Sequence, residues 1–130
     1  MTKSKRKCIS TDTTRPDLKD LKFCPGTRAE LMAFPPNIIK ESGFQLDRIQ
    51  RGLDPDHWKP FESVGKGVNE CIIDDASGWY RVLYIAKFEE AVYVLHCFQK
   101  KTNQTSQSDI DLAKKRLSEL KQYRQKKGLK

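Results

Sequence analysis

Long apolar runs are missing from this sequence of 130 residues. No stretch approaches the roughly 18 apolar residues that a membrane-spanning helix needs, so we expect no contact with a membrane. The basic start MTKSKRKC is not followed by an apolar segment and is therefore not typical of a secretory signal. We expect a cytoplasmic protein.

Cysteine pairs and histidines are also scarce. The four cysteines stand at positions 8, 24, 71 and 97 with no C-x-x-C spacing, and the chain has only two histidines. Cys71 and Cys97 lie in apolar runs, where free cysteine behaves as a small hydrophobic side chain. We therefore predict reduced thiols, no metal site and no cofactor, so that any hydrolytic chemistry comes from side chains alone.

Charge is present in excess, but mainly at the two ends. The formal net charge is +8; residues 1–20 hold six Lys/Arg and three Asp/Glu, residues 112–130 hold eight and one, and residues 21–111 hold eleven and thirteen. Such basic ends are either simply solvated or bind nucleic acid. We predict one domain over residues 21–124, a flexible basic tail over residues 1–20 and a basic tail over residues 125–130.

Capping patterns predict two helices in the first half of the domain. Thr27 and Glu30 fit a T-x-x-E capping box for a short helix that runs to Phe34. Pro36 suits the first turn of a second helix, which Gly52 ends.

The second half predicts a sheet and a closing helix. After a short first strand within residues 17–24 and a loop at 53–67, the segments VNECII (68–73), WYRVLYIA (79–86) and AVYVLHCF (91–98) predict an antiparallel meander. Ser108 and Asp111 fit an S-x-x-D cap for an amphipathic helix. This order indicates an α+β domain, in which an antiparallel sheet packs against two N-terminal helices with a C-terminal helix.

The turn lengths predict which strand residues meet. A four-residue turn DASG pairs Ile72 with Arg81, and a four-residue turn KFEE pairs Arg81 with His96. Glu70, two residues before Ile72, then lies diagonal to Arg81 on the same face. The register thus predicts a group of Glu70, Arg81 and His96.

Each candidate has a structural and a chemical interpretation. Arg81 lies in an apolar strand, where it either pairs with Glu70 or binds a phosphate bidentately. His96 is either a half-buried strand residue or a group for proton transfer. Lys100 and Lys101 are either solvated or border the same pocket. Together these groups suit a phosphodiester site without metal, and RNA is favoured because it supplies its own nucleophile, the 2′-hydroxyl.

From Gly26 to Leu120 the chain resembles the RelE/ParE superfamily of bacterial toxins, and looks closest to the phage-derived HigB-like branch. The segments that carry the likeness are TRAELMAFP, WKPFESVGKGVNE, YRVLY and AVYVLHCFQKKTNQTSQSDIDLAKKRL. The resemblance implies a RelE-like fold and a toxin of a type II toxin-antitoxin system. It also implies a metal-independent endoribonuclease (mRNA interferase) that acts on mRNA at the ribosome and is paired with a helix-turn-helix antitoxin.

The same resemblance assigns roles to individual residues. Arg81 matches the arginine of Y-R-x-x-Y and Lys101 the basic residue after the last strand, so these two would stabilise the transition state. His96 or Glu70 would exchange protons. Contacts to RNA phosphates would be salt-sensitive. The residues expected to bind RNA are Lys66, Lys100, Lys114, Lys115, Lys121 and Arg124, with Lys126 and Lys127 in the basic tail.

The chain also departs from the family pattern. Ile72 and Asp74 stand where RelE-type strands carry basic residues, and Ser106 stands where the branch often has proline. No tyrosine follows Lys101 until Tyr123, so the RelE-like catalytic tyrosine is missing from its expected place. Two alternatives therefore stay open: a ParE-like inhibitor of gyrase that cuts nothing, and a non-catalytic regulator that only binds its antitoxin.

Overall fold

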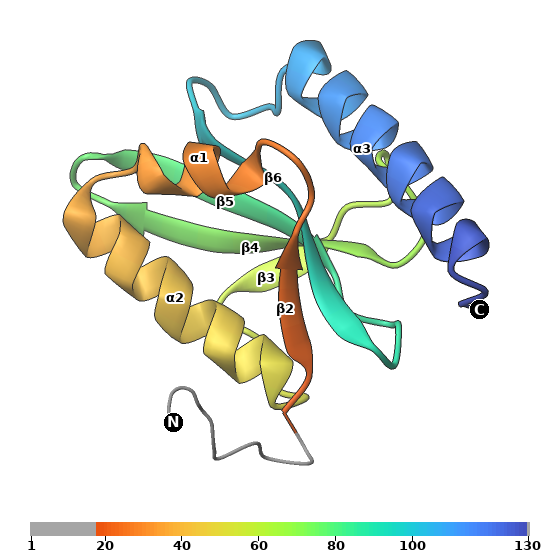
Figure 1. Cartoon of the computed structure of the whole chain (residues 1–130). Coiled ribbons are helices and arrows are strands. Elements are labelled where there is room, and N and C mark those ends of the chain that lie inside the picture. The colour runs from red at the N-terminus through yellow and green to blue at the C-terminus, as the bar shows by residue number, and fades with distance from the viewer. Residues whose placement is uncertain (1–17, 130) are drawn as a thin grey trace.

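A five-stranded sheet forms the centre of the computed structural model, which describes residues 18–129 (Figure 1). The elements are β2 (Asp20–Phe23), α1 (Thr27–Met32), α2 (Pro36–Gln50), β3 (Trp58–Pro60), β4 (Val68–Asp75), β5 (Gly78–Ile85), β6 (Ala91–Lys100) and α3 (Gln107–Lys126). The predicted α+β class, with two N-terminal helices, a sheet and a C-terminal helix, is confirmed. Cys8 and the first 17 residues of the predicted N-terminal tail lie outside the described residues.

The strand order is β2-β6-β5-β4-β3, and the predicted antiparallel meander of β4, β5 and β6 is confirmed. β2 pairs with β6 in parallel, so the sheet is mixed rather than purely antiparallel. β3 was predicted to be part of a loop over residues 53–67, and that prediction is wrong for its three residues. They pair with β4 at the sheet edge, and a strand so short carries no periodicity to reveal it.

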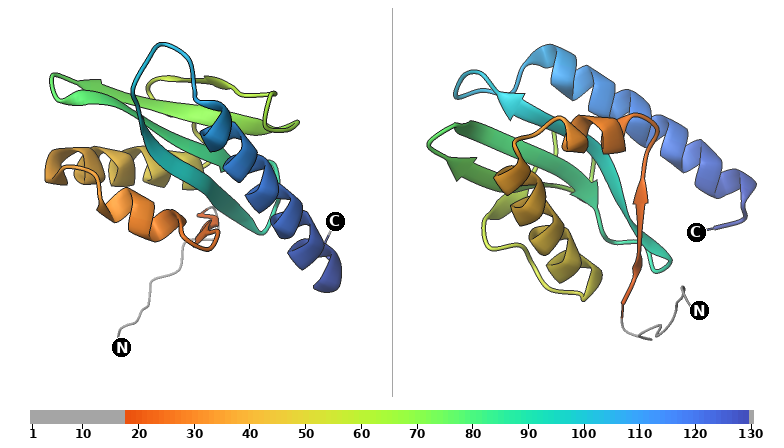
Figure 2. Two further views of the ribbon diagram at one scale, coloured as in Figure 1. Left: turned by 90° about the horizontal axis from the view of Figure 1, so that it is seen from above. Right: turned by 60° about the vertical axis from the view of Figure 1, so that its left-hand side comes forward.

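Helices pack on both faces of the sheet, and because side chains alternate along each strand, each face contributes to a core of its own. In Figures 1 and 2, α1 and α2 lie together on one side, and α3 packs against β6 apart from them. The core under α1 and α2 contains Leu31, Phe34, Ile38, Leu46, Ile49, Cys71, Ile73, Tyr80, Val82, Tyr84, Val92, Val94 and Cys97. The core under α3 contains Cys24, Val64, Val68, Leu83, Ile85, Ala91, Tyr93, Leu95, Phe98, Ala113, Leu117 and Leu120.

The start of α1 differs from the predicted capping box. The N-cap is Gly26 at φ 92°, and no side chain caps the helix. The Thr27 hydroxyl donates to the carbonyl of Cys24, while Glu30 accepts from the backbone N–H of Cys97 on β6. Because β2 ends at Phe23, the β6 edge beyond residue 94 has no strand partner, and the Glu30 carboxylate satisfies an edge donor there.

The start of α3 also differs from the prediction. Its N-cap is Ser106, whose Oγ accepts from the backbone N–H of Asp109 at 3.2 Å. The predicted cap, Ser108 with Asp111, is therefore two residues too late, because the same S-x-x-D spacing occurs twice and local sequence does not choose between the copies.

One predicted register is right and the other is wrong. Ile72 pairs with Arg81, as the DASG turn predicts. Arg81 pairs with Phe98 rather than His96, and His96 pairs with Leu83. The turn after β5 adds one residue to the register, and a β-bulge near Leu95 on β6 adds a second. Because the shift is of two residues, His96 stays on the same face of the sheet as Arg81. It lies opposite Leu83, two residues beyond Arg81 on β5.

Candidate active site

A polar groove of about 540 Å³ lies beside the start of α3, on the sheet face that α3 covers only in part. Its walls come from β3 and the loop that follows, from β4 and β6, and from the segment that leads into α3. The polar side chains that line it include Lys59, Glu62, Glu70, Lys100, Asn103 and Gln107. We call this feature the sheet groove.

Glu70, which lines the sheet groove, forms a buried ion pair with Arg81. Glu70 is 2% exposed and Arg81 is 8% exposed, and Arg81 Nε lies 3.8 Å from Glu70 Oε2. That distance is too long for a hydrogen bond, and neither atom has a hydrogen-bond partner among residues 18–129. Buried charged atoms without hydrogen bonds are costly, and Arg81 Nε and Glu70 Oε2 are two such atoms.

Other charges surround this pair. Arg81 Nη1 donates to Asp74 Oδ1 at 2.6 Å and to the carbonyl of Tyr80 at 2.9 Å. On the other side, Lys59 Nζ lies 3.6 Å from Glu70 Oε1. The arginine is thus held between two carboxylates, and a lysine from β3 supports one of them.

The predicted lysines fall at different places. Lys100 pairs with Trp79 across the ladder, lies on the same face as Arg81, and lines the sheet groove, where its Nζ donates to the carbonyl of Asn103. Lys101 follows in the exposed turn after β6. Lys66 precedes the first residue of β4, Val68, which pairs with Ile85 at the far end of β5 from Arg81. The fold therefore brings Lys100 close to Arg81 and keeps Lys66 apart from it.

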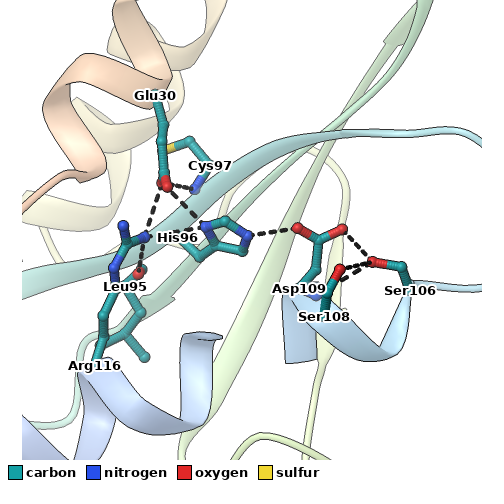
Figure 3. Close-up of polar contacts among 8 residues, drawn as sticks. All are labelled: Glu30, Leu95, His96, Cys97, Ser106, Ser108, Asp109 and Arg116. Carbon is teal, nitrogen blue, oxygen red and sulfur yellow. Dashed lines mark hydrogen bonds and ion pairs between the residues drawn. The ribbon is translucent and has the colours of Figure 1, made fainter. Parts of the chain in front are cut away.

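His96 is buried in a cluster of charged side chains beside the groove (Figure 3). Its Nδ1 lies 3.0 Å from Glu30 Oε1 of α1, and its Nε2 lies 2.7 Å from Asp109 Oδ1 of α3. The ring stacks on Phe98 with 4.9 Å between centroids. Arg116 of α3 donates to Glu30 Oε1 at 2.9 Å and to the carbonyl of Leu95.

The two carboxylates set the protonation of His96. Burial alone would lower the pKa of His96, but the hydrogen bonds with Glu30 and Asp109 raise it above its usual value. Burial alone would raise the pKa of Glu30, but hydrogen bonds from His96, Arg116 and the Cys97 N–H lower it to about 2. Arg116 Nη1 also lies 3.1 Å from His96 Nδ1. A protonated Nδ1 is a donor and cannot accept a hydrogen bond. The two nitrogens are therefore close because both donate to Glu30 Oε1.

Sequence reasoning missed the partners of His96. Glu30, Asp109 and Arg116 lie 66, 13 and 20 positions away along the chain. Glu30 was interpreted as a cap residue, and no role was predicted for Asp109 or Arg116. The only local signal was the S-x-x-D pattern at Ser106, which places Asp109 in the first turn of α3.

Residues 29–118 match the model of a family described as Phage derived protein Gp49-like (DUF891). The chain belongs to this family. The Gp49-like family is phage-derived and toxin-like, and is associated with RelE/ParE-type toxins of toxin-antitoxin systems. The match includes Glu70, Arg81, His96 and the sheet groove. No curated protein and no solved structure matched the chain.

The basic side chains of α3 in this Gp49-like protein do not all face solvent. Lys114, Lys115 and Lys121 are exposed, whereas Arg124 is buried. Arg124 donates to both carboxylate oxygens of Glu90, at 2.7 and 3.1 Å. Its guanidinium also lies 3.5 Å from the ring centroid of Phe88. These hydrogen bonds with Arg124 lower the pKa of Glu90 to about 2.

The thiols of the Gp49-like protein sit in apolar surroundings. Cys24, Cys71 and Cys97 are free and buried, and burial raises the pKa of Cys24 to about 11 and of Cys71 to about 12. Thiols with such pKa values stay protonated and unreactive at neutral pH. Within residues 18–129, no three His, Cys, Asp or Glu side chains are grouped to hold a metal ion, and no helix is long and apolar enough to cross a membrane.

Proposed function

We propose that this Gp49-like protein is the toxin of a HigB-like type II toxin-antitoxin system and cleaves mRNA at the ribosome. The observation that carries the proposal is the Arg81–Glu70 pair beside the sheet groove, in which Arg81 Nε and Glu70 Oε2 each lack a hydrogen-bond partner within the described chain. A guanidinium beside a carboxylate offers a phosphate-binding group and a proton acceptor at the same point.

The proposed reaction uses the 2′-hydroxyl of RNA as nucleophile. This oxygen forms a bond to the neighbouring phosphorus while its proton passes to the Glu70 carboxylate. The bond between phosphorus and the 5′-oxygen breaks, which leaves a 2′,3′-cyclic phosphate on one fragment and a 5′-hydroxyl on the other. Arg81, with Lys100 and Lys101 at the end of β6, stabilises the negative charge that develops on the phosphate oxygens.

Lys59 is the proposed proton donor to the departing 5′-oxygen. Its Nζ lies 3.6 Å from Glu70 Oε1, so the proton that Glu70 receives can return to Lys59 after cleavage. This transfer restores both groups, and the proton balance closes without a cofactor.

The remaining predicted residues take supporting roles in this proposal. His96 positions the start of α3, because its ring nitrogens are bonded to Glu30 and Asp109 rather than directed into the groove. Lys66, Lys114, Lys115, Lys121, Lys126 and Lys127 contact ribosomal RNA. We leave Arg124 out of that set, because its guanidinium is buried against Glu90 and Phe88. A helix-turn-helix antitoxin in the cytoplasm is the proposed protein partner.

Inducing the protein in growing bacteria and mapping new RNA 5′ ends tests the proposal. We expect cuts at fixed codon positions of translated messages, with 5′-hydroxyl ends. Arg81→Ala should abolish these cuts. Lys40→Ala removes a positive charge from the exposed surface of α2, on the other side of the sheet, and should cut like the wild type.

Two results would contradict the nuclease proposal. DNA damage with intact mRNA would indicate the ParE-like alternative. Unchanged growth with intact mRNA, together with tight antitoxin binding, would indicate a non-catalytic regulator. Circular dichroism and thermal unfolding of Arg81→Ala separate loss of chemistry from loss of fold.

A further inference from the structure

A large aromatic side chain is exposed on the sheet face that carries the Arg81–Glu70 pair. Trp79 on β5 is 40% exposed. It stands two residues before Arg81 on the same strand, so both side chains point to the same face. Its cross-strand partners are Asp74 on β4 and Lys100 on β6, so the indole lies between two polar side chains.

The second tryptophan shows that the placement of Trp79 matters more than its exposure. Trp58 on β3 is 36% exposed, which is close to the value for Trp79. Trp58 pairs with Cys71, whose side chain belongs to the core under α1 and α2, so Trp58 lies on the opposite face of the sheet. Of the two indoles, Trp79 is the one that shares a face with Arg81, Glu70 and Lys100.

We propose that Trp79 is a stacking platform for an RNA base next to the phosphate held at Arg81. The proposal rests on the RNA-cleaving function proposed above and names a residue that binds the substrate there. Trp79 and Arg81 are separated by about 7 Å along the strand, at roughly 3.4 Å per residue. A nucleotide bridges such a gap between its phosphate and its base, so a phosphate at Arg81 places a neighbouring base over the indole.

The charges around Trp79 suit this arrangement. Lys100, directly across the ladder, attracts the sugar-phosphate backbone at the edge of the stacked base. Asp74, on the other side, is bound by Arg81 Nη1, so its negative charge is largely compensated. Base stacking on an aromatic ring accepts any base. Trp79 therefore positions single-stranded RNA of any sequence, with a modest preference for purines because they present the larger ring surface.

Two single-tryptophan variants test this proposal directly. Trp58→Phe keeps Trp79 as the only indole, and Trp79→Phe keeps Trp58. Each is titrated with a short mixed-sequence 2′-O-methyl RNA carrying a fluorophore, which cannot be cleaved because its 2′-oxygen has no proton. Anisotropy of the fluorophore reports binding, and tryptophan emission reports stacking. We expect the emission of Trp58→Phe to be quenched along the binding curve and that of Trp79→Phe to stay constant.

Affinities provide a second readout. Trp79→Ala should weaken RNA binding about tenfold, as expected for the loss of one base stack, whereas Trp79→Phe should retain most of the affinity. Trp58→Ala is the matched control and should bind like the wild type. A series of RNAs, each with an abasic nucleotide at a different position, gives a third comparison. Wild-type protein should bind one of these RNAs more weakly than the others, whereas Trp79→Ala should bind all of them alike.

The possible failures are distinguishable. RNA binding with unquenched Trp79 emission and an unchanged affinity in Trp79→Ala would overturn the stacking proposal and leave the nuclease proposal intact. Absence of any RNA binding by the wild type would overturn the stacking proposal, whereas intact mRNA in induced cells is the result that would overturn the nuclease proposal. Quenching of Trp79 by the antitoxin but not by RNA would assign this face to protein docking and overturn the stacking proposal.

Discussion

His96 Nε2 donates to Asp109 Oδ1 at 2.7 Å, and this hydrogen bond fixes the first turn of α3 to β6. The segment between these two residues contributes Lys100, Asn103, Gln104, Thr105 and Gln107 to the sheet groove. This hydrogen bond joins the two ends of the segment that forms one wall of the groove. The protonation state of His96 therefore affects the shape of the proposed site.

The stability of the protein should depend on pH through His96. Hydrogen bonds with Glu30 and Asp109 overcome the effect of burial and raise the pKa of His96 above its usual 6.5. Because the folded pKa exceeds the unfolded one, the stabilisation is fully present below pH 6.5 and is lost as pH rises through the folded value. We expect the free energy of unfolding to fall over that range, by at most about 1.4 kcal/mol per pH unit for one proton.

Urea denaturation from about pH 5.5 upward measures this slope. His96→Gln should flatten it and lower the stability most at acid pH. His57→Gln, at the exposed second histidine, should leave it unchanged. An equal slope in wild type and His96→Gln would contradict a protonated His96 bridge.

Arg124→Lys should destabilise the fold by about 1–3 kcal/mol, because a lysine cannot donate to both oxygens of Glu90. The pKa of Glu90 is lowered to about 2, so its stabilising effect is present above pH 4.5 and is lost as pH falls toward 2. Thermal unfolding between these two pH values should show a smaller acid loss in the variant. Lys126→Ala is the control, and unchanged stability with weaker ribosome binding would instead make Arg124 an RNA contact.

Asp74→Asn should strengthen RNA binding by roughly fivefold, or about 1 kcal/mol, because it removes a carboxylate that competes with phosphate for Arg81 Nη1. The matched control is Asp75→Asn, which changes the next carboxylate, bonded to Ser77 and Asn37 instead. Anisotropy titrations with non-cleavable RNA compare the variants. Weaker binding by Asp74→Asn would show that Asp74 orients Arg81 rather than competing for it.

The double change Lys114→Ala with Lys115→Ala should reduce the salt dependence of ribosome binding. Each lost phosphate contact lowers the slope of log affinity against log salt by about 1. Sedimentation with ribosomes at several salt concentrations gives the slope. Lys40→Ala serves as the control for a lost charge far from α3, and an unchanged slope in the double variant would remove α3 from the RNA surface.

Local patterns predicted the parts of the fold that depend on neighbouring residues. The DASG turn fixed the pairing of Ile72 with Arg81, because a tight turn ties two strands together within a few residues. That pairing placed Glu70 diagonal to Arg81, and the ion pair is present. The register predicted from KFEE failed because the turn adds one residue and a bulge farther along β6 adds a second, and neither leaves a clear mark in the sequence.

The sequence by itself determined the class of fold, the meander, the uneven charge and the family likeness, since each follows from composition or short-range pattern. Only the tertiary structure decided what His96 touches, because its partners come from α1 and α3, 66 and 13 positions away. The same holds for Glu30, a predicted cap residue that instead satisfies the open edge of β6. A buried polar group takes whichever partner the packed elements bring within reach, and that choice is made when helices dock on the sheet.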